Sequence, residues 1–298
     1  MSFLEGTNQL YRHQYWFRAK HSTVYPVIHL LNQVANENGN ITKIITMATF
    51  LYLNKAFDTI SHNILLKRLE KLGIRGIANT WFKSYLSDRR QYMEIYKVKS
   101  HLEENQCGVP QGSILGPILF LLYINDIQNS TSLKVLCFAD DTTCSYSSSN
   151  TKKLYVTMNQ EFEKINQWFR ANKLCLNISK TKYIIFRPSG SHEAVNDQSW
   201  YIDNQVIEQI GNHTNTNFFK FLGMAIDENI SLKKQIDNVC AKLSRANYII
   251  NKVKDTVPKH WLLTLYQSII QCHVNIWLQI WGSSNSVERI FKVNSYNK

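Results

Sequence analysis

The sequence predicts an α+β fold, in which helices and strands follow one another without a regular alternation. Two observations predict it. Apolar residues recur at helical spacing in several stretches, of which 154–169 is a long example. Short runs rich in Val, Ile, Thr and Phe, such as 181–186, are typical of strands. Hydrophobic residues make up 44% of the 298 positions and charged residues 19%, which is the balance of a globular chain.

Helices are expected where apolar residues keep a helical spacing between capping residues. Ser22 or Thr23 caps the first of them, and Gly73 ends the second. The expected helices are 23–34, 62–72, 77–86, 113–126, 154–169, 236–253 and 259–281.

Strands are expected between these helices, where β-branched and aromatic residues gather. The expected strands are 41–53, 91–99, 133–138, 142–147 and 181–186, with two more near Gln205 and Phe219. The polar, loop-like segment 188–199 is predicted to be the boundary between domains, and the chain shows no internal repeat.

Charge and composition narrow the class of protein. The formal net charge of +12 favours a polyanionic partner, although many basic proteins bind no nucleic acid. The longest apolar run, 114–124, is too short to cross a bilayer, and the first residues carry no secretory signal. The cysteines form no CxxC pair, which predicts free thiols, no zinc site and an intracellular location, nucleus or cytoplasm undecided. They are Cys107, Cys137, Cys144, Cys175, Cys240 and Cys272.

Asp140 and Asp141 are the clearest candidates for chemistry, because they stand together at a tight turn between two apolar strands. Adjacent carboxylates repel each other, so they are best tolerated beside cations or solvent. Magnesium prefers such hard oxygen ligands, and nucleotide polymerisation uses two such ions. Taken alone, the pair is more typical of an exposed Asp-Asp turn than of a metal site.

Several short motifs surround this pair in a fixed order. They lie at 14–18 with 21–23, 53–59, 108–117, 138–141, 177–182 with Phe186, 221–223 and 280–282. In sequence, order and spacing they resemble the motifs of reverse transcriptases from non-LTR retrotransposons, the LINE-like and jockey-like group. The closest matches are Gly-Val-Pro-Gln-Gly-Ser at 108–113 and Phe-Ala-Asp-Asp at 138–141.

The resemblance implies a right-hand polymerase with fingers, an α+β palm that contains a short antiparallel sheet, and a helical thumb. Partial fingers, truncated at the N-terminus, would occupy 1–47, and the palm with a finger-like helical insertion 48–187. A linker and strand would follow at 188–217, and a primer-contacting hairpin with a truncated thumb at 218–298.

The resemblance also assigns roles to residues. Asp140 and Asp141 would bind the catalytic Mg²⁺ ions, and Phe57 would lie beneath the incoming sugar and exclude a 2′-hydroxyl, a plain core position being the alternative. Lys180 or Lys182 would assist proton transfer to pyrophosphate, and the sequence leaves that choice open. Other contacts to nucleotide, template or primer would come from Arg18, Gln111, Gly112, Phe221, Leu222 and Gly223. The implied partners are an RNA template, a DNA primer and deoxynucleotides, with no membrane and no zinc.

Tyr52 departs from the family pattern, which places an aspartate at this position of the first palm motif. A phenol has a pKa of about 10 and brings no charge to a metal ion near neutral pH. Asp58 is expected to face another way, and Asp126, at the end of a helix, has no reason to face the metals. Trp16 is a second departure, because the family usually has a glycine there, which allows a turn or a close approach of the backbone.

Basic residues also stand beside aromatic ones, as Arg89 and Arg90 do before Tyr92. This pattern suits contacts to phosphates and unpaired bases, and it suits a solvated basic face equally well. Three functional hypotheses follow from the whole sequence. The chain is a reverse transcriptase impaired by Tyr52, a catalytically dead remnant that binds RNA or primer-template, or a fragment without function.

Overall fold

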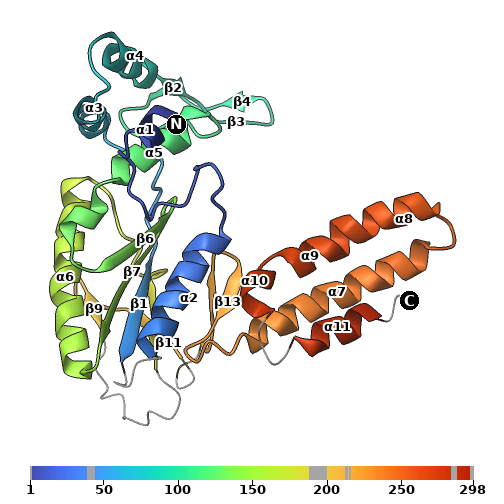
Figure 1. Ribbon diagram of the computed structural model, residues 1–298. Helices are drawn as coiled ribbons and strands as arrows, with labels where there is room; N and C mark the ends of the chain where they lie inside the picture. The colour runs from blue at the N-terminus through green and yellow to red at the C-terminus, as the bar shows by residue number, and fades with distance from the viewer. Residues whose placement is uncertain are drawn as a thin grey trace. The chain divides into compact units, whose positions relative to one another are not determined.

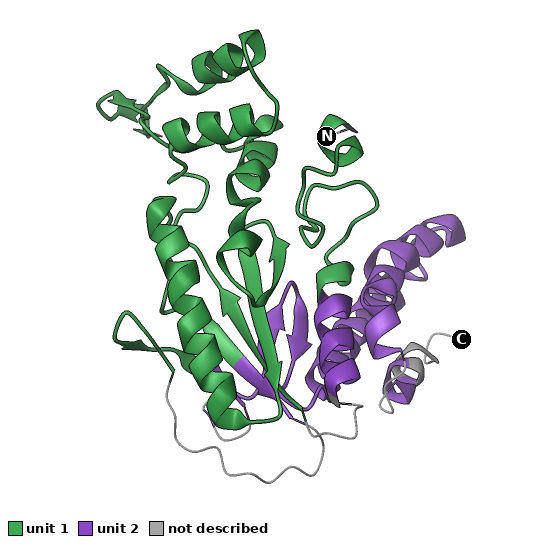
Figure 2. Cartoon of the chain, turned by 60° about the vertical axis from the view of Figure 1, so that its left-hand side comes forward, with its two compact units in different colours: residues 1–26, 44–183, 192–208 green, residues 27–43, 184–191, 209–298 purple. Residues whose placement is uncertain are grey.

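The computed structural model describes residues 2–38, 44–187, 200–211, 214, 216–282 and 287–295. The chain divides into two compact units, shown in Figure 2. Unit 1 comprises residues 1–26, 44–183 and 192–208, and unit 2 comprises residues 27–43, 184–191 and 209–298. This division follows different boundaries from the four segments expected from the sequence, and the predicted boundary at 188–199 lies outside the described residues.

A five-stranded sheet has the order β11-β8-β1-β7-β6. β7 pairs antiparallel with β1 on one side and with β6 on the other. All seven residues of β1 are buried, which explains why this strand contains no charged residue. The strands are β1 (Ile45–Leu51), β6 (Lys134–Phe138), β7 (Asp141–Ser148), β8 (Lys182–Phe186) and β11 (Glu208–Ile210).

The helix α6 (Thr151–Ala171) runs along this sheet and contacts β1 and β7 (Figure 1). Its N-terminus is capped by Asn150, whose side chain accepts a hydrogen bond from the backbone N–H of Lys153 at 3.0 Å. Burying each large apolar side chain of this face contributes roughly 1.5–3 kcal/mol. The buried apolar residues repeat with the period of a helix, as the sequence predicted, and are Leu154, Tyr155, Met158, Phe162, Ile165 and Phe169.

One carboxylate of α6 holds the loop before β6. The Glu161 side chain accepts hydrogen bonds from Lys164 Nζ at 2.5 Å, from the backbone N–H of Ser132 at 2.6 Å and from Thr131 Oγ1 at 2.9 Å. The Lys164 ammonium, and after it the Ser132 amide, lower the pKa of Glu161 to about 2. This carboxylate is therefore a structural group, ionised across the physiological range.

A mainly helical insertion separates β1 from β6. Its helix α3 packs against both α4 and α5. Its elements are α3 (His62–Lys71), α4 (Ile77–Leu86), β2 (Arg90–Gln91), β3 (Glu94–Ile95), β4 (Val98–Lys99), β5 (Glu103–Glu104), α5 (Leu115–Ile124) and the 3₁₀ turn η1 (Ile127–Ser130). The expected single strand at 91–99 is wrong. Tyr96 and Lys97 both have positive φ, 48° and 67°, and turn the chain back between β3 and β4.

Unit 2 holds the C-terminal helices. Ile236, Val239 and Leu243 form a buried stripe on α7 (Lys233–Val253). This helix contacts α8, α11 (Glu288–Ser295) and β13 (Met224–Ile226). The long helix expected at 259–281 is interrupted, because Trp277 has a left-handed backbone with φ of 65°. Its pieces are α8 (Lys259–Tyr266), a π-helical turn (Gln267–Gln271), α9 (Cys272–Asn275) and α10 (Leu278–Trp281).

The remaining elements complete the α+β class, which is confirmed. They are α1 (Ser2–Gly6), α2 (Val24–Asn38), β9 (Tyr201–Ile202), β10 (Gln205–Val206), β12 (Phe219–Phe221), β13 (Met224–Ile226), α7 (Lys233–Val253) and α11 (Glu288–Ser295). Where the structure describes the chain, no helix combines the length and the apolar character that crossing a membrane requires.

Candidate active site

The two adjacent aspartates lie at the turn between β6 and β7. Phe138 pairs with Asp141, so Ala139 and Asp140 form a two-residue loop. Ala139 has a φ of 57°, a conformation that a tight hairpin loop demands of its first central residue. Asp140 therefore stands in the turn, and Asp141 is the first residue of β7.

Tyr52 lies beside this turn. Leu51 at the end of β1 pairs with Thr142 of β7, so the chain leaves β1 level with Asp141. Burial raises the pKa of Tyr52 to about 12, and the charges of Asp141 and Asp140 act in the same direction. The phenol thus shares the electrostatic environment of both carboxylates and remains neutral.

The two carboxylates are themselves close enough to affect each other. Burial raises the pKa of Asp141 to about 6, and the charge of Asp140 adds to that rise. Such a pair has the chemistry to hold a hard divalent cation, whose charge would offset the repulsion. Among the residues that the structure describes, no group of three or more His, Cys, Asp or Glu side chains is arranged to hold a metal. Asp140 and Asp141 are the pair that the hairpin offers.

Neither of the other acids considered from the sequence takes the place of an aspartate at position 52. Asp58 Oδ1 accepts a hydrogen bond from Gln111 Nε2 at 2.8 Å. Asp126 Oδ1 forms an ion pair with Arg68 Nη1 at 2.7 Å. Both carboxylates are engaged by side chains outside the hairpin.

Backbone hydrogen bonds bring three of the sequence motifs together. The N–H groups of Gly108 and Val109 donate to the carbonyls of Ile60 and Phe57 at 2.8 and 2.9 Å. The N–H of Asn177 donates to the carbonyl of Tyr52 at 2.7 Å. The motifs at 108–117 and 177–182 therefore both lie against the segment that follows β1.

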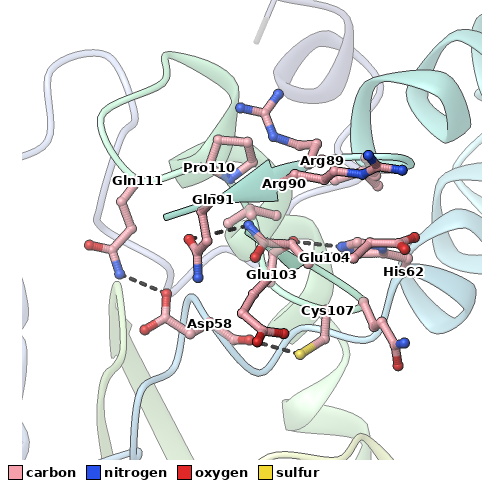
Figure 3. Close-up of a pocket in the computed structure, with 15 residues that line it drawn as sticks. Asp58, His62, Arg89, Arg90, Gln91, Glu103, Glu104, Cys107, Pro110 and Gln111 are labelled. Carbon is pink, nitrogen blue, oxygen red and sulfur yellow. Dashed lines mark hydrogen bonds between the residues drawn. The ribbon is translucent and has the colours of Figure 1, made fainter. Parts of the chain in front are cut away.

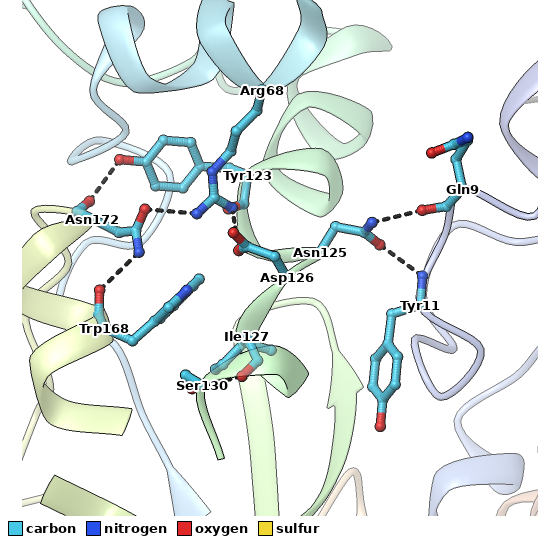
Figure 4. Close-up of polar contacts among 10 residues, drawn as sticks. All are labelled: Gln9, Tyr11, Arg68, Tyr123, Asn125, Asp126, Ile127, Ser130, Trp168 and Asn172. Carbon is cyan, nitrogen blue, oxygen red and sulfur yellow. Dashed lines mark hydrogen bonds and ion pairs between the residues drawn. The ribbon is translucent and has the colours of Figure 1, made fainter. Parts of the chain in front are cut away.

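The amino-terminal segment lies along β6. The carbonyl of Cys137 accepts from the N–H of Tyr15, and the N–H of Cys137 donates to the carbonyl of His13, both at 2.9 Å. Asn125, at the end of α5, also holds this segment, because its side chain bonds the N–H of Tyr11 and the carbonyl of Gln9 at 2.7 Å each. Figure 4 shows this contact on its right-hand side.

Phe57 is half-buried within a group of aromatic rings. Its ring stacks on Phe120 with centroids 4.6 Å apart and meets Trp16 edge-on at 5.9 Å. The positive φ of this segment, 54°, falls on Phe17 and not on Trp16. A large side chain at position 16 is therefore compatible with the backbone there, and what it introduces is the contact with Phe57.

Gly108 is required by a close approach of two loops. It has a φ of 86°, and a Cβ atom there would lie 2.9 Å from the Cα and carbonyl oxygen of Asp58. Gly112 also has a positive φ, 81°, but has open space around it. Gly108 is thus required by the close approach of Asp58 as well as by its backbone conformation, whereas Gly112 is favoured by its backbone conformation alone.

The same loop borders a polar cavity of about 890 Å³, shown in Figure 3. Asp58 and Gln111 meet at one side of it, and Arg89, in the loop after α4, and Arg90, at the start of β2, also line it. Glu103 and Glu104 of β5 also line it, so the cavity carries both signs of charge.

The cationic residues singled out from the sequence differ in their surroundings. Arg18 donates to the carbonyls of Tyr11, Arg12 and Gln14 at 3.3–3.4 Å, and so organises the amino-terminal loop. Lys182 pairs with Glu208, whereas the exposed side chain of Lys180 has no ion pair in the described part of the chain.

The expected primer-contacting residues form a tight hairpin of unit 2. Phe221 ends β12 and is buried, and Leu222 and Gly223, with φ of 48° and 96°, make the turn into β13. Positive φ at both central residues is the signature of the type I′ turn that favours hairpins.

An arginine whose side chain is 13% exposed links the helices that surround the site, which the sequence did not reveal. Arg68 of α3 bonds the Tyr123 carbonyl and, at 2.7 Å, Asn172 Oδ1, and it pairs with Asp126 (Figure 4). Its guanidinium also lies 5.2 Å from the Tyr123 ring centre and 5.5 Å from that of Trp168. Tyr123 Oη donates in turn to the Asn172 carbonyl at 2.6 Å. The arginine thereby connects α3, α5 and the end of α6.

Comparison with known proteins gives a consistent result. A family model described as reverse transcriptase (RNA-dependent DNA polymerase) matches residues 2–226. The chain is 25% identical over 293 residues to the probable RNA-directed DNA polymerase from transposon X-element of Drosophila melanogaster. It is 25% identical over 287 residues to that from transposon BS, and 22% identical over 289 residues to that from mobile element jockey, both of the same organism. These matches cover 91–95% of this chain but 30% of each relative.

Solved structures extend the likeness in fold. A telomerase from Candida albicans, in complex with a fragment of telomeric RNA, covers 99% of this chain and 56% of its own, with a TM-score of 0.51 and 12% identity. The apo telomerase of Candida tropicalis covers 78% of this chain and 38% of its own, with a TM-score of 0.50 and 12% identity. At such identities the likeness concerns the fold alone.

Proposed function

The chain belongs to the reverse transcriptase (RNA-dependent DNA polymerase) family, related to the jockey, X-element and BS polymerases of non-LTR retrotransposons, and from that premise we propose its function. It is the polymerase domain of such a mobile element, built for transfer of deoxynucleotides to a primer 3′-hydroxyl on an RNA template. In this copy the reaction is impaired by Tyr52. The chain spans about 30% of the length of these relatives, so any activity of a whole element is part of the proposal.

The arrangement of residues supports separate roles in binding metal, nucleotide and template. Asp140 and Asp141 would hold Mg²⁺, which supplies charge stabilisation for the attacking and leaving oxygens. Phe57, already stacked on Phe120, would form the floor beneath the sugar of the nucleotide. Gln111, exposed and oriented by Asp58, would face the template together with Gly112.

The remaining roles concern the leaving pyrophosphate, the amino-terminal loop and the primer. Lys180 is favoured over Lys182 as the mobile cation for a leaving pyrophosphate, because Lys182 is held by Glu208. Arg18 acts through the loop it organises. Residues 221–223 would contact the primer. Partial fingers, palm, linker and thumb would correspond to 1–47, 48–187, 188–217 and 218–298.

The observation that carries the proposal of impairment is the neutral phenol of Tyr52 beside Asp140 and Asp141. Metal ions stabilise such transition states by several kcal/mol. If the missing carboxylate accounts for about 4 kcal/mol of that, the rate falls by roughly a thousandfold.

Primer extension tests the proposal. The unmodified chain, Tyr52→Asp and Tyr52→Phe are compared on an RNA template with Mg²⁺ and deoxynucleotides. Tyr52→Asp should extend the primer roughly a thousandfold faster than the unmodified chain. Tyr52→Phe keeps the ring, removes the hydroxyl and should match the unmodified chain. Full activity in the unmodified chain, lost in Tyr52→Phe, would overturn the assignment of Tyr52 as a damaging residue.

A binding remnant is the second candidate function. It is favoured by the same Tyr52 and by the net charge of +12. Filter binding of RNA across a salt series tests it, because phosphate contacts make affinity fall steeply as salt rises. Absent or salt-independent binding would eliminate this candidate.

A further inference from the structure

A ladder of flat side chains lies on the surface of α4. The rings of Trp81 and Tyr85 are one helical turn apart and stack with centroids 5.5 Å apart at 12°. The guanidinium of Arg89 continues the series, 5.7 Å from the centre of the Tyr85 ring. We call these three residues the α4 ladder.

The ladder is open to solvent rather than part of the core. Trp81 is 53% exposed, and Ile77, one turn before it, is 91% exposed. The helix α4 packs against α3, and Leu86 is its buried residue. Water thus covers a large aromatic surface, and such surfaces on folded proteins mark interaction sites.

The groups around the ladder indicate what kind of partner it fits. Arg89 and Arg90 follow α4 after Ser87 and Asp88, and they line the polar cavity that Asp58 and Gln111 also border. On the neighbouring hairpin, Lys99 Nζ lies 4.8 Å from the ring centre of Tyr92, which is half-exposed. Aromatic faces interleaved with cations suit unpaired nucleobases, since a base stacks on a ring while a cation meets its phosphate. Lys99 is also paired with Glu94 at 3.9 Å, and Glu103 and Glu104 line the same cavity, so the phosphate contacts would fall on Arg89 and Arg90.

We propose that the α4 ladder binds single-stranded nucleic acid, with unpaired bases stacking on Trp81 and Tyr85 and phosphates contacting Arg89 and Arg90. Recognition would be independent of base sequence, because every base offers a flat face. The proposal rests on the family assignment and deepens the nucleic-acid binding argued above, since it names a surface whose binding requires neither Asp140 nor Asp141.

Fluorescence anisotropy of labelled 15-residue oligo(U) and oligo(dT) provides the test. Stacking on an aromatic ring is worth enough that Trp81→Ala should weaken binding about 5- to 150-fold. The dependence of affinity on salt should keep its slope in Trp81→Ala, because the lost contact is uncharged. In Arg90→Gln the slope of log affinity against log salt should fall by about 0.7, the value for one phosphate contact to a single strand.

Trp261→Ala is the matched control, since Trp261 of α8 is equally exposed, at 56%, and outside the ladder. Its binding should equal that of the unmodified chain. A change below twofold in Trp81→Ala, or an equal loss in Trp261→Ala, overturns the proposal. So does unchanged oligonucleotide binding with Trp81-dependent self-association in sedimentation, because the ladder would then serve a protein partner.

The outcome is separable from that of the proposed function. Circular dichroism and urea midpoints of Trp81→Ala should match those of the unmodified chain, which excludes unfolding as the cause of weaker binding. Primer extension by Tyr52→Asp is measured in parallel. Oligonucleotide binding that depends on Trp81, without extension by Tyr52→Asp, refutes the polymerase proposal and supports the ladder. Extension by Tyr52→Asp with binding that does not depend on Trp81 supports the polymerase proposal and refutes the ladder.

Discussion

Arg68 is the residue whose removal should most disturb the scaffold of the site. Replacing it by methionine keeps an apolar stem against the rings of Tyr123 and Trp168 and removes the guanidinium. The Asn172 amide oxygen and the Tyr123 carbonyl then lose their donor. Asn172 is 6% exposed, so water does not readily replace that donor.

The magnitude follows from these contacts. Each buried acceptor left without a partner costs about 1–3 kcal/mol. Losing the cation over two aromatic rings adds about 1 kcal/mol. Asp126 is half-exposed, so its lost ion pair costs at most about 1 kcal/mol. Together these give a loss of roughly 3–8 kcal/mol in the free energy of unfolding, a large fraction of the total stability of a typical protein.

Urea unfolding followed by circular dichroism measures this loss. The matched control is Arg170→Met, because Arg170 pairs with Asp203 at 2.6 Å but is 62% exposed. That control should change the free energy of unfolding by less than about 1 kcal/mol. If Arg68→Met costs no more than Arg170→Met, the argument that Arg68 links the helices is wrong.

Three further predictions concern single contacts. The pKa of Glu161 is lowered to about 2, so the stability that its carboxylate contributes is complete above its ordinary pKa and is lost as pH falls from there toward 2. The Glu161→Gln variant should therefore show a smaller decline of the urea midpoint over that pH range than the unmodified chain. Gly108→Ala combines a positive φ with a backbone clash and should cost about 3 kcal/mol or more, against about 1 kcal/mol for Gly112→Ala, in thermal or urea unfolding. Asn125→Ala removes two hydrogen bonds to the amino-terminal segment, so hydrogen exchange should rise at the backbone amides of 11–15 while α6 stays protected.

Local signals in the sequence were sufficient for the elements that carry the site. The hairpin around Asp140 was predicted because apolar runs flank a polar turn, and the structure places β6 and β7 there. The helix 77–86 was predicted with the bounds it has, since apolar residues keep a helical period there. In both cases the residues that decide the structure lie within a few positions of one another.

Other features depend on residues distant in sequence and could not be predicted. The bond between Asp58 and Gln111 joins two loops 53 positions apart. The left-handed backbone at Trp277 breaks a stretch whose apolar period is helical throughout, because packing overrides propensity. Nothing local distinguishes such positions from an ordinary turn or helix.

The α4 ladder lies between these cases. Its spacing, four residues from Trp81 to Tyr85 and four more to Arg89, is visible in the sequence. The same spacing predicts an apolar face turned toward the core, however, and exposure is what separates the two interpretations. The sequence pattern therefore predicts the spacing of the ladder, and the fold shows that Trp81 is exposed rather than part of the core.

The phenol of Tyr52 cannot readily replace an aspartate as an anionic metal ligand, because it must first lose its proton. From the ordinary tyrosine pKa of about 10, forming the phenolate at pH 7 costs about 4 kcal/mol. Burial and the charges of Asp141 and Asp140 raise the pKa of Tyr52 further, so that the cost grows. Coordination of a divalent cation would have to supply this free energy before the phenol became an anionic ligand, whereas an aspartate at position 52 would be ionised in advance. Raising the pH toward 9 should therefore not rescue primer extension in the unmodified chain, while Tyr52→Asp restores it at pH 7.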